Sequence, residues 1–166
     1  MSRTPTGRIL QQDGRPVLRL TRTFRAPRED VWAAVTEPER LRRWIGTWSG
    51  EPATGRVTFV MEAEGDATGE EMEIRECVPP RVLRLTSHVG EARWHLDLVL
   101  EEDDGVTTLT FEQPGVDPTE AESTGPGWEY YLDRLVAAET GGDVDAIDFE
   151  RDYYPAMVGH YRDQAR

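Results

Sequence analysis

The chain has 166 residues and a formal net charge of −13 at pH 7, from 32 acidic and 19 basic side chains. This length suits one domain with a sizeable core, and no apolar run approaches the roughly 20 residues that a membrane span needs. The negative charge argues against nucleic acid and anionic membranes as partners, because both repel an acidic surface. Cys77 is the only cysteine, so no internal disulfide can form and a cytoplasmic location is expected.

The first third of the chain predicts a strand followed by two short helices. Residues 1–14 are polar and are expected to form a tail with at most a short strand. Residues 17–25 alternate apolar and polar side chains, which is typical of a half-buried strand. A helix is predicted over residues 28–36, and Pro38 ends it and begins a second short helix. That second helix is expected to continue up to a glycine- and proline-rich loop at residues 46–55.

Five further strands are predicted between residues 56 and 113, and three hairpins among them can be given a register. The turns are expected at residues 65–68, 89–90 and 104–105. In each hairpin the predicted register sets apolar side chains opposite each other on one face: Met61 with Met72, Phe59 with Ile74, Leu85 with Trp94, Leu83 with Leu96, Leu100 with Leu109, and Leu98 with Phe111. A slip of one residue would turn these side chains to the other face, so the inner face is well specified.

Residues 127–138 predict the helix that covers the apolar face of this sheet. Their apolar side chains recur at helical spacing: Trp128, Tyr131, Leu132, Leu135 and Val136. Glu129, Asp133 and Arg134 are expected on the opposite, solvent-exposed face. The preceding residues, 114–127, are expected to form a polar loop.

The predicted elements form a single domain over residues 15–141, preceded by the tail or short strand at 1–14. An appendage follows at residues 142–166, which is acidic at first and then aromatic. It is expected to be partly docked, with a short helix after Pro155. No internal repeat and no second domain are predicted.

Three segments resemble one family of domains. They are residues 22–34 (RTFRAPREDVWAA), 37–44 (EPERLRRW) and 127–135 (GWEYYLDRL). Together they resemble START-like (SRPBCC) domains, and specifically the branch called activator-of-Hsp90-ATPase-homology-1-like (AHSA1-type). The chain departs from that pattern at residues 51–56, where one glycine stands in place of the usual pair, and beyond residue 142.

This resemblance implies an α+β helix-grip (START/Bet v 1-like) fold. In that fold a curved antiparallel sheet wraps around a long C-terminal helix, and two short helices follow the first strand. The resemblance also implies a cavity between the sheet and the last helix. Members of the superfamily hold lipids, hormones, polyketides or other apolar molecules there, some catalyse cyclisation or hydrolysis, and eukaryotic relatives bind the chaperone Hsp90.

The candidate site is an apolar pocket with aromatic walls, occupied by a small hydrophobic molecule. Its expected lining is Trp44, Trp48, Phe59, Met61, Met72, Glu76, Trp94, Phe111, Trp128, Tyr131 and Leu132. Glu76 shares the inward parity of Met72 and Ile74, so it is a candidate for orienting a polar group of the ligand. No catalytic motif is present, and no histidine has metal-ligand spacing, so no cofactor or metal is expected.

Three alternatives to ligand binding stay open. The apolar faces could fill a packed core with no ligand. The same cavity could belong to a cyclase or hydrolase with Glu76 or His88 as the base, although no sequence motif supports this. The domain could be an interaction module with a chaperone partner, which the acidic outer face supports little. Homodimers are common for such folds, and nothing in the sequence locates an interface.

Overall fold

An eight-stranded antiparallel sheet forms the frame of the protein. The structure, a computed structural model, describes residues 3–65 and 68–166. The strands lie in the order β1-β2-β8-β7-β6-β5-β4-β3. Their bounds are Arg8–Gln12 (β1), Arg15–Phe24 (β2), Thr47–Ser49 (β3), Arg56–Val60 (β4), Glu70–Val78 (β5), Val82–Val89 (β6), Ala92–Asp103 (β7) and Val106–Pro114 (β8). Every predicted strand is present, and β3 is an additional edge strand in the segment that was expected to be a loop.

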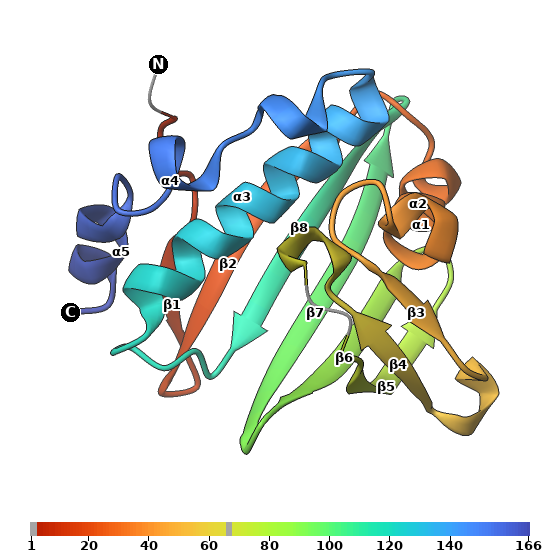
Figure 1. The fold of residues 1–166 in the computed structure, drawn as a ribbon, viewed down its shortest axis with the longest axis horizontal. Helices are drawn as coiled ribbons and strands as arrows, with labels where there is room; N and C mark the ends of the chain where they lie inside the picture. Colours follow the sequence, from red (N-terminus) through yellow and green to blue (C-terminus); the bar gives the residue numbers. More distant parts are fainter. Residues whose placement is uncertain (1–2, 66–67) are drawn as a thin grey trace.

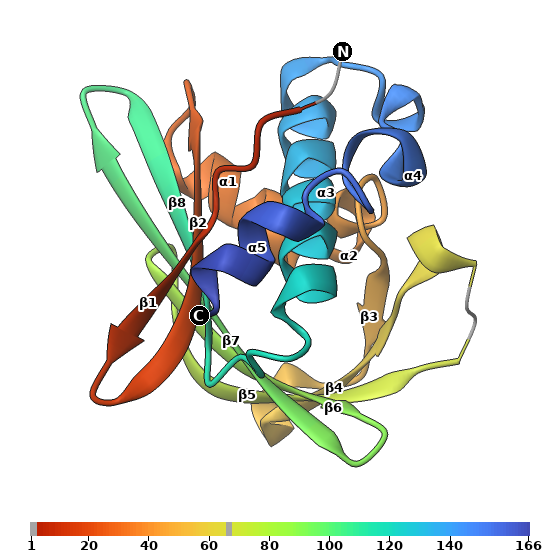
Figure 2. The same ribbon diagram turned by 90° about the vertical axis from the view of Figure 1, so that its left-hand side faces the viewer.

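One long helix, α3, crosses the concave face of this sheet (Figure 1), and the sheet curves around it (Figure 2). The helices are Arg28–Thr36 (α1), Pro38–Leu41 (α2), Ala121–Thr140 (α3), Phe149–Asp152 (α4) and Val158–Gln164 (α5), with 3-10 turns at Pro52–Thr54 (η1), Glu62–Glu64 (η2) and Val144–Ala146 (η3). The α+β helix-grip fold is therefore confirmed. The second short helix ends at Leu41, earlier than predicted, because the following residues form tight turns back to its last carbonyls.

The strand registers are confirmed in one hairpin and corrected in two. Between β7 and β8, Leu100 pairs with Leu109 and Leu98 with Phe111, as predicted. Between β6 and β7 the partners are shifted by two residues, because the turn centres on Gly90, which has a positive φ of 61°. The observed pairs there are Leu85 with Leu96, Leu83 with Leu98 and Ser87 with Trp94.

The β4–β5 hairpin is shifted by four residues from its predicted register. Met72 was expected to pair with Met61 but pairs with Val57. Phe59 was expected to pair with Ile74 but pairs with Glu70. The chain leaves β4 after Val60 and enters the turn η2, which uses up the residues that were expected to pair. This shift and that of the β6–β7 hairpin are both even, so the inner face of β4, β6, β7 and the first part of β5 is the predicted one.

Helix α3 begins six residues before the predicted start and contains Pro126 in its interior. Residues 114–127 are polar and were expected to form a loop, and a proline inside a helix removes one backbone hydrogen bond. The burial of this segment outweighs that loss, because Ala121, Thr124, Gly125 and Pro126 are all buried. Gly125 lies directly under the ring of Tyr161 from α5, which leaves no room for a side chain.

The back of α3, which was predicted to face solvent, is covered by both ends of the chain (Figure 2). Glu129 is 1% exposed. Its carboxylate accepts hydrogen bonds from the backbone N–H of Thr6 at 2.6 Å and from Nη2 of Arg22 at 3.1 Å. Asp133 accepts from Nε of Arg22 at 3.0 Å and from the hydroxyl of Tyr153 at 2.7 Å. The expectation of a solvent-exposed face is therefore wrong.

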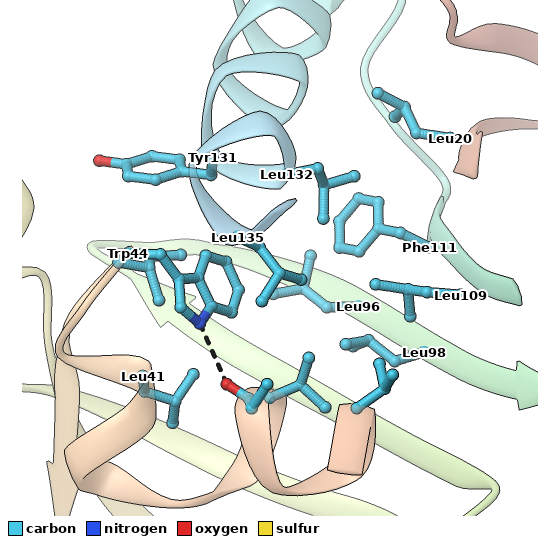
Figure 3. Close-up of a cluster of buried hydrophobic side chains, with 14 of the residues drawn as sticks. Leu20, Leu41, Trp44, Leu96, Leu98, Leu109, Phe111, Tyr131, Leu132 and Leu135 are labelled. Atoms are coloured by element: carbon cyan, nitrogen blue, oxygen red, sulfur yellow. Dashed lines mark hydrogen bonds between the residues drawn. The ribbon is translucent and has the colours of Figure 1, made fainter. Parts of the chain in front are cut away.

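The sheet and α3 are packed tightly at one end of their contact. Figure 3 shows Leu109 and Phe111 from the sheet facing Leu132 and Leu135 of α3, with Trp44 beside them. Leu109 and Leu135 are fully buried. A cavity adjoins this cluster toward the start of α3, and Trp44, Phe111 and Leu132 border both. Within the described residues, no helix has the length and hydrophobicity to cross a membrane.

Candidate ligand-binding cavity

A cavity of about 740 Å³ lies between the sheet and α3. This volume falls within the range of roughly 300 to 1,000 Å³ that is usual for small-molecule sites. Ten of the eleven residues predicted to line a pocket do line it: Trp44, Trp48, Phe59, Met61, Met72, Trp94, Phe111, Trp128, Tyr131 and Leu132. The walls come from α1, α2, five central strands, β3 and α3, so distant parts of the sequence meet there.

The floor of the cavity is built from rows of paired side chains on the sheet. The first row is Cys77, Leu83, Leu98 and Phe111, the next is Ile74, Leu85 and Leu96, and the third is Met72, Ser87 and Trp94. The first two rows are apolar except for the thiol. Ser87 adds a hydroxyl in the third row, so the polarity of the floor rises toward the hairpin that joins β6 and β7.

Trp128 forms the wall on the α3 side, and its orientation is fixed. Its indole Nε1 donates a hydrogen bond to Oε1 of Gln113 at 2.9 Å. Gln113 is 4% exposed, and the ring of Phe111 lies 4.4 Å from that of Trp128, centroid to centroid. Because the only polar hydrogen of its side chain is donated to Gln113, Trp128 presents an apolar ring to the cavity.

Two tryptophans form the opposite wall, and the end of α1 holds both. Trp44 Nε1 donates to the carbonyl oxygen of Ala34 at 3.0 Å, as the dashed line in Figure 3 marks. Trp48 Nε1 donates to the carbonyl oxygen of Thr36 at 2.7 Å. These carbonyls belong to the last turn of α1, where backbone acceptors lack helical partners. Trp44 is 4% exposed, so it is buried in the wall.

Glu76 does not line the cavity, which corrects the prediction. A β-bulge in β5, between Ile74 and Glu76, shifts the register against β6. The bulge reverses the alternation of the strand, so Glu76 lies on the outer face and Cys77 turns toward the cavity. Glu76 is paired there with Nε of Arg84 at 2.8 Å.

His88, the other candidate base, is also absent from the cavity lining. It follows Ser87, which faces inward, so strand alternation directs its ring to the outer face. Its Nε2 lies 3.7 Å from a carboxylate oxygen of Glu73 and 3.9 Å from one of Glu71. Neither of the two predicted bases is therefore placed to act on a molecule in the cavity.

Several lining residues were missed by sequence reasoning. Phe149 reaches the cavity from α4 in the C-terminal appendage and packs against Tyr130, with ring centroids 5.2 Å apart. No local pattern signals this, because it depends on how the appendage docks. Ser123 and Thr124 were missed because the first turns of α3 were expected to be a loop.

Few polar or charged side chains line the cavity. Within the described residues, no group of three histidine, cysteine, aspartate or glutamate side chains is placed to hold a metal ion. The charged residues of the lining are Glu70, at the start of β5, and Glu120, just before α3. The cavity can therefore hold an apolar body by burial and meet a polar group near those two carboxylates.

Comparison with known proteins agrees with this geometry. The family model described as activator of Hsp90 ATPase homolog 1-like protein matches residues 25–139. CalU16 from Micromonospora echinospora is a similar solved structure, with 21% identity, a TM-score of 0.67, and coverage of 98% of this chain and 92% of its own. EF2215 from Enterococcus faecalis, a conserved protein of unknown function, has 19% identity, a TM-score of 0.71, and coverage of 95% and 89%.

DynU16, described as a protein in the dynemicin biosynthetic locus, is similar over a shorter stretch. It has 26% identity and a TM-score of 0.65, over 77% of this chain and 49% of its own. None of the curated proteins that were compared matches the chain. The matched family model spans more than half of the chain, including α1 and nearly all of α3. The chain therefore belongs to the activator of Hsp90 ATPase homolog 1-like family and is a START-like (SRPBCC) domain.

Proposed function

We propose that the protein binds one small, largely apolar molecule in the cavity between the sheet and α3. The observation that carries this proposal is the cavity of about 740 Å³, with tryptophans on both walls. Burial of apolar surface would supply the affinity, at about 25 cal/mol per Å² removed from water. The relative in a biosynthetic locus, DynU16, supports a natural product as the class of ligand.

A packed core without a ligand fits this cavity poorly. Protein interiors are close-packed, and voids much larger than a water molecule are few. The α3 side of the cavity is open at Gly127, where an added Cβ would have no atom within 4 Å. The indole hydrogens of Trp44, Trp48 and Trp128 are all bound to protein acceptors, so the aromatic walls are set before any ligand arrives.

Ligand binding is preferred over the two other functions for a structural reason. The catalytic alternative relied on Glu76 or His88, and neither lines the cavity. The chaperone alternative rests on the name of the family, and the acidic outer face of the sheet gives it little support. We place the binding function in the cytoplasm, as the single cysteine suggested.

The proposal is tested by adding side-chain volume to the cavity at Gly127. Gly127→Leu places a branched side chain in the open space, while Gly127→Ala adds one methyl group and serves as the matched control. Naphthylethanol is the probe, and calorimetry measures its dissociation constant while urea unfolding measures stability. We expect G127L to lose at least tenfold in affinity with undiminished stability, and G127A to bind nearly as the wild type does.

Trp128→Ala and Glu76→Gln complete the set. Trp128→Ala should weaken probe binding more than folding, because Trp128 borders the cavity. Glu76→Gln should leave binding unchanged, because Glu76 lies on the outer face. A packed core predicts the opposite pattern: no saturable binding, and a loss of about 1–3 kcal/mol in G127L through overpacking.

A further inference from the structure

We infer that the ligand is an amphiphile with a cationic group, and that Glu70 and Glu120 receive this group at the cavity mouth. The inference rests on the proposed function and adds the chemical class of the ligand. It comes from the order of side chains along the cavity, from the charges of the lining, and from the ion pairs of the described residues, none of which involves Glu70 or Glu120.

On the sheet side, Glu70 lies beyond the last row of the cavity floor. Met72 pairs with Ser87, and Ser87 with Trp94, to form the outermost row. Glu70 precedes Met72 by two residues on the same face of β5, so it lies one step of about 7 Å further toward the rim. The floor therefore changes from apolar to hydroxyl to carboxylate along one direction.

On the helix side, Glu120 lies at the same end of the cavity. Trp128 is hydrogen-bonded to Gln113 on the sheet, and the residues of α3 that follow Trp128 lie further from the rim. Glu120 precedes Trp128 by eight residues, which is about 12 Å of helix toward the rim. Glu120 and Ser123 are exposed, as are Pro52 and Cys77 elsewhere in the lining, and exposure is expected for residues at an opening.

Within the part of the chain that the structure describes, the negative charge of the mouth has no ion-pair partner. Among the described residues of the lining, Glu70 and Glu120 are charged and no arginine is present. Of the ion pairs formed within residues 3–65 and 68–166, none involves either carboxylate. Arg93, beside Trp94 on β7, has the outward parity of the strand.

These charges select the polar end of the ligand. A protonated amine that reaches the mouth gains attraction from both carboxylates, whereas a fatty-acid carboxylate at the same place is repelled. A neutral hydroxyl would gain only a hydrogen bond. The apolar floor and the tryptophan walls disfavour a charge among them, because an unpaired charge there would lose its hydration.

The experiment compares three probes with the same aromatic body. Naphthylethylamine is cationic, naphthylethanol is neutral and naphthylacetate is anionic, and calorimetry gives their dissociation constants. We expect the amine to bind about fivefold to tenfold more tightly than the alcohol, and the acid to bind more weakly than either. This ratio of affinities is modest because the amine would form two partly exposed ion pairs, which are individually weak.

Two double variants separate the mouth from the overall charge of the protein. Glu70→Gln with Glu120→Gln should abolish the preference for the amine over the alcohol. Glu37→Gln with Glu150→Gln removes the same charge from two exposed sites outside the cavity lining and should keep the preference.

The outcomes distinguish this inference from the proposed function. Saturable binding of the alcohol with no preference for the amine, or a preference that survives E70Q/E120Q, overturns the cationic class and leaves the cavity function standing. If none of the three probes binds saturably, the proposed function fails, and this inference fails with it.

Discussion

Removal of Arg22 should destabilise the fold far more than removal of another arginine on the same strand. Arg22 has a side chain that is 10% exposed, and it is paired with Glu129 and Asp133. Arg22→Met leaves the carboxylate of Glu129, itself 1% exposed, without its cation. Breaking a buried pair in this way typically costs about 3–5 kcal/mol. For a domain of this size, that loss corresponds to a fall in Tm of about 6–20 °C.

Arg19→Met is the matched control, because Arg19 lies on β2 and pairs with Glu112 at 2.7 Å with side chains 38% and 20% exposed. Such an exposed pair contributes about 0–1 kcal/mol. Urea unfolding followed by circular dichroism gives the free energy of unfolding of both variants. The reasoning is refuted if R22M loses no more stability than R19M. Arg22→Met combined with Glu129→Met should recover part of the loss, because the unpaired buried charge is then gone.

Two further predictions concern stability and follow from contacts of α3 and the C-terminal appendage. Gly125→Ala should destabilise by about 1–3 kcal/mol because its Cβ would overlap the ring of Tyr161, whereas Gly127→Ala should stabilise by about 0.5–1 kcal/mol because its Cβ meets no atom within 4 Å. Urea unfolding of both variants checks this, and changes of the same sign would contradict it. Burial raises the pKa of Tyr153 and Tyr161 above the ordinary 10.0, helped by the neighbouring charges of Asp133 and Glu129 respectively. Above about pH 10 the unfolded chain loses protons that the folded chain keeps, so stability should fall by up to about 1.4 kcal/mol per pH unit for each tyrosine. Unfolding curves at about pH 9 and about pH 11 measure this slope, and Tyr153→Phe with Tyr161→Phe should reduce it. An undiminished slope in that double variant would show that other groups cause it.

Local patterns predicted the elements that local chemistry determines. Asp104 and Gly105 form the β7–β8 turn, both with positive φ, and the register there agrees residue for residue with the prediction. Strict alternation also predicted the inner face of the sheet, and so most of the cavity lining. The other two hairpins were misplaced because neither the turn η2 nor the position of the Gly90 turn is specified by alternation alone.

The errors at the candidate site have two physical sources. The bulge in β5 adds one residue without any change in hydrophobic pattern before it, so Glu76 was assigned to the wrong face. The second source is contact between distant segments. Glu129 was assigned to solvent because its partners Thr6 and Arg22 lie more than a hundred positions away in the sequence. Phe149 was overlooked because its place depends on how the C-terminal appendage folds back onto Tyr130 of α3.

A titration observed by NMR tests the central claim most directly, because it locates the bound molecule. Protein with labelled methyl groups would be titrated with naphthylethanol. A ligand in the cavity predicts saturable shifts at one site, largest for methyl groups of the lining such as Met61, Met72 and Leu85. Methyl groups buried outside the lining, such as those of Leu18 and Val116, should hardly move. Shifts that do not saturate, or that are largest outside the lining, would contradict the account.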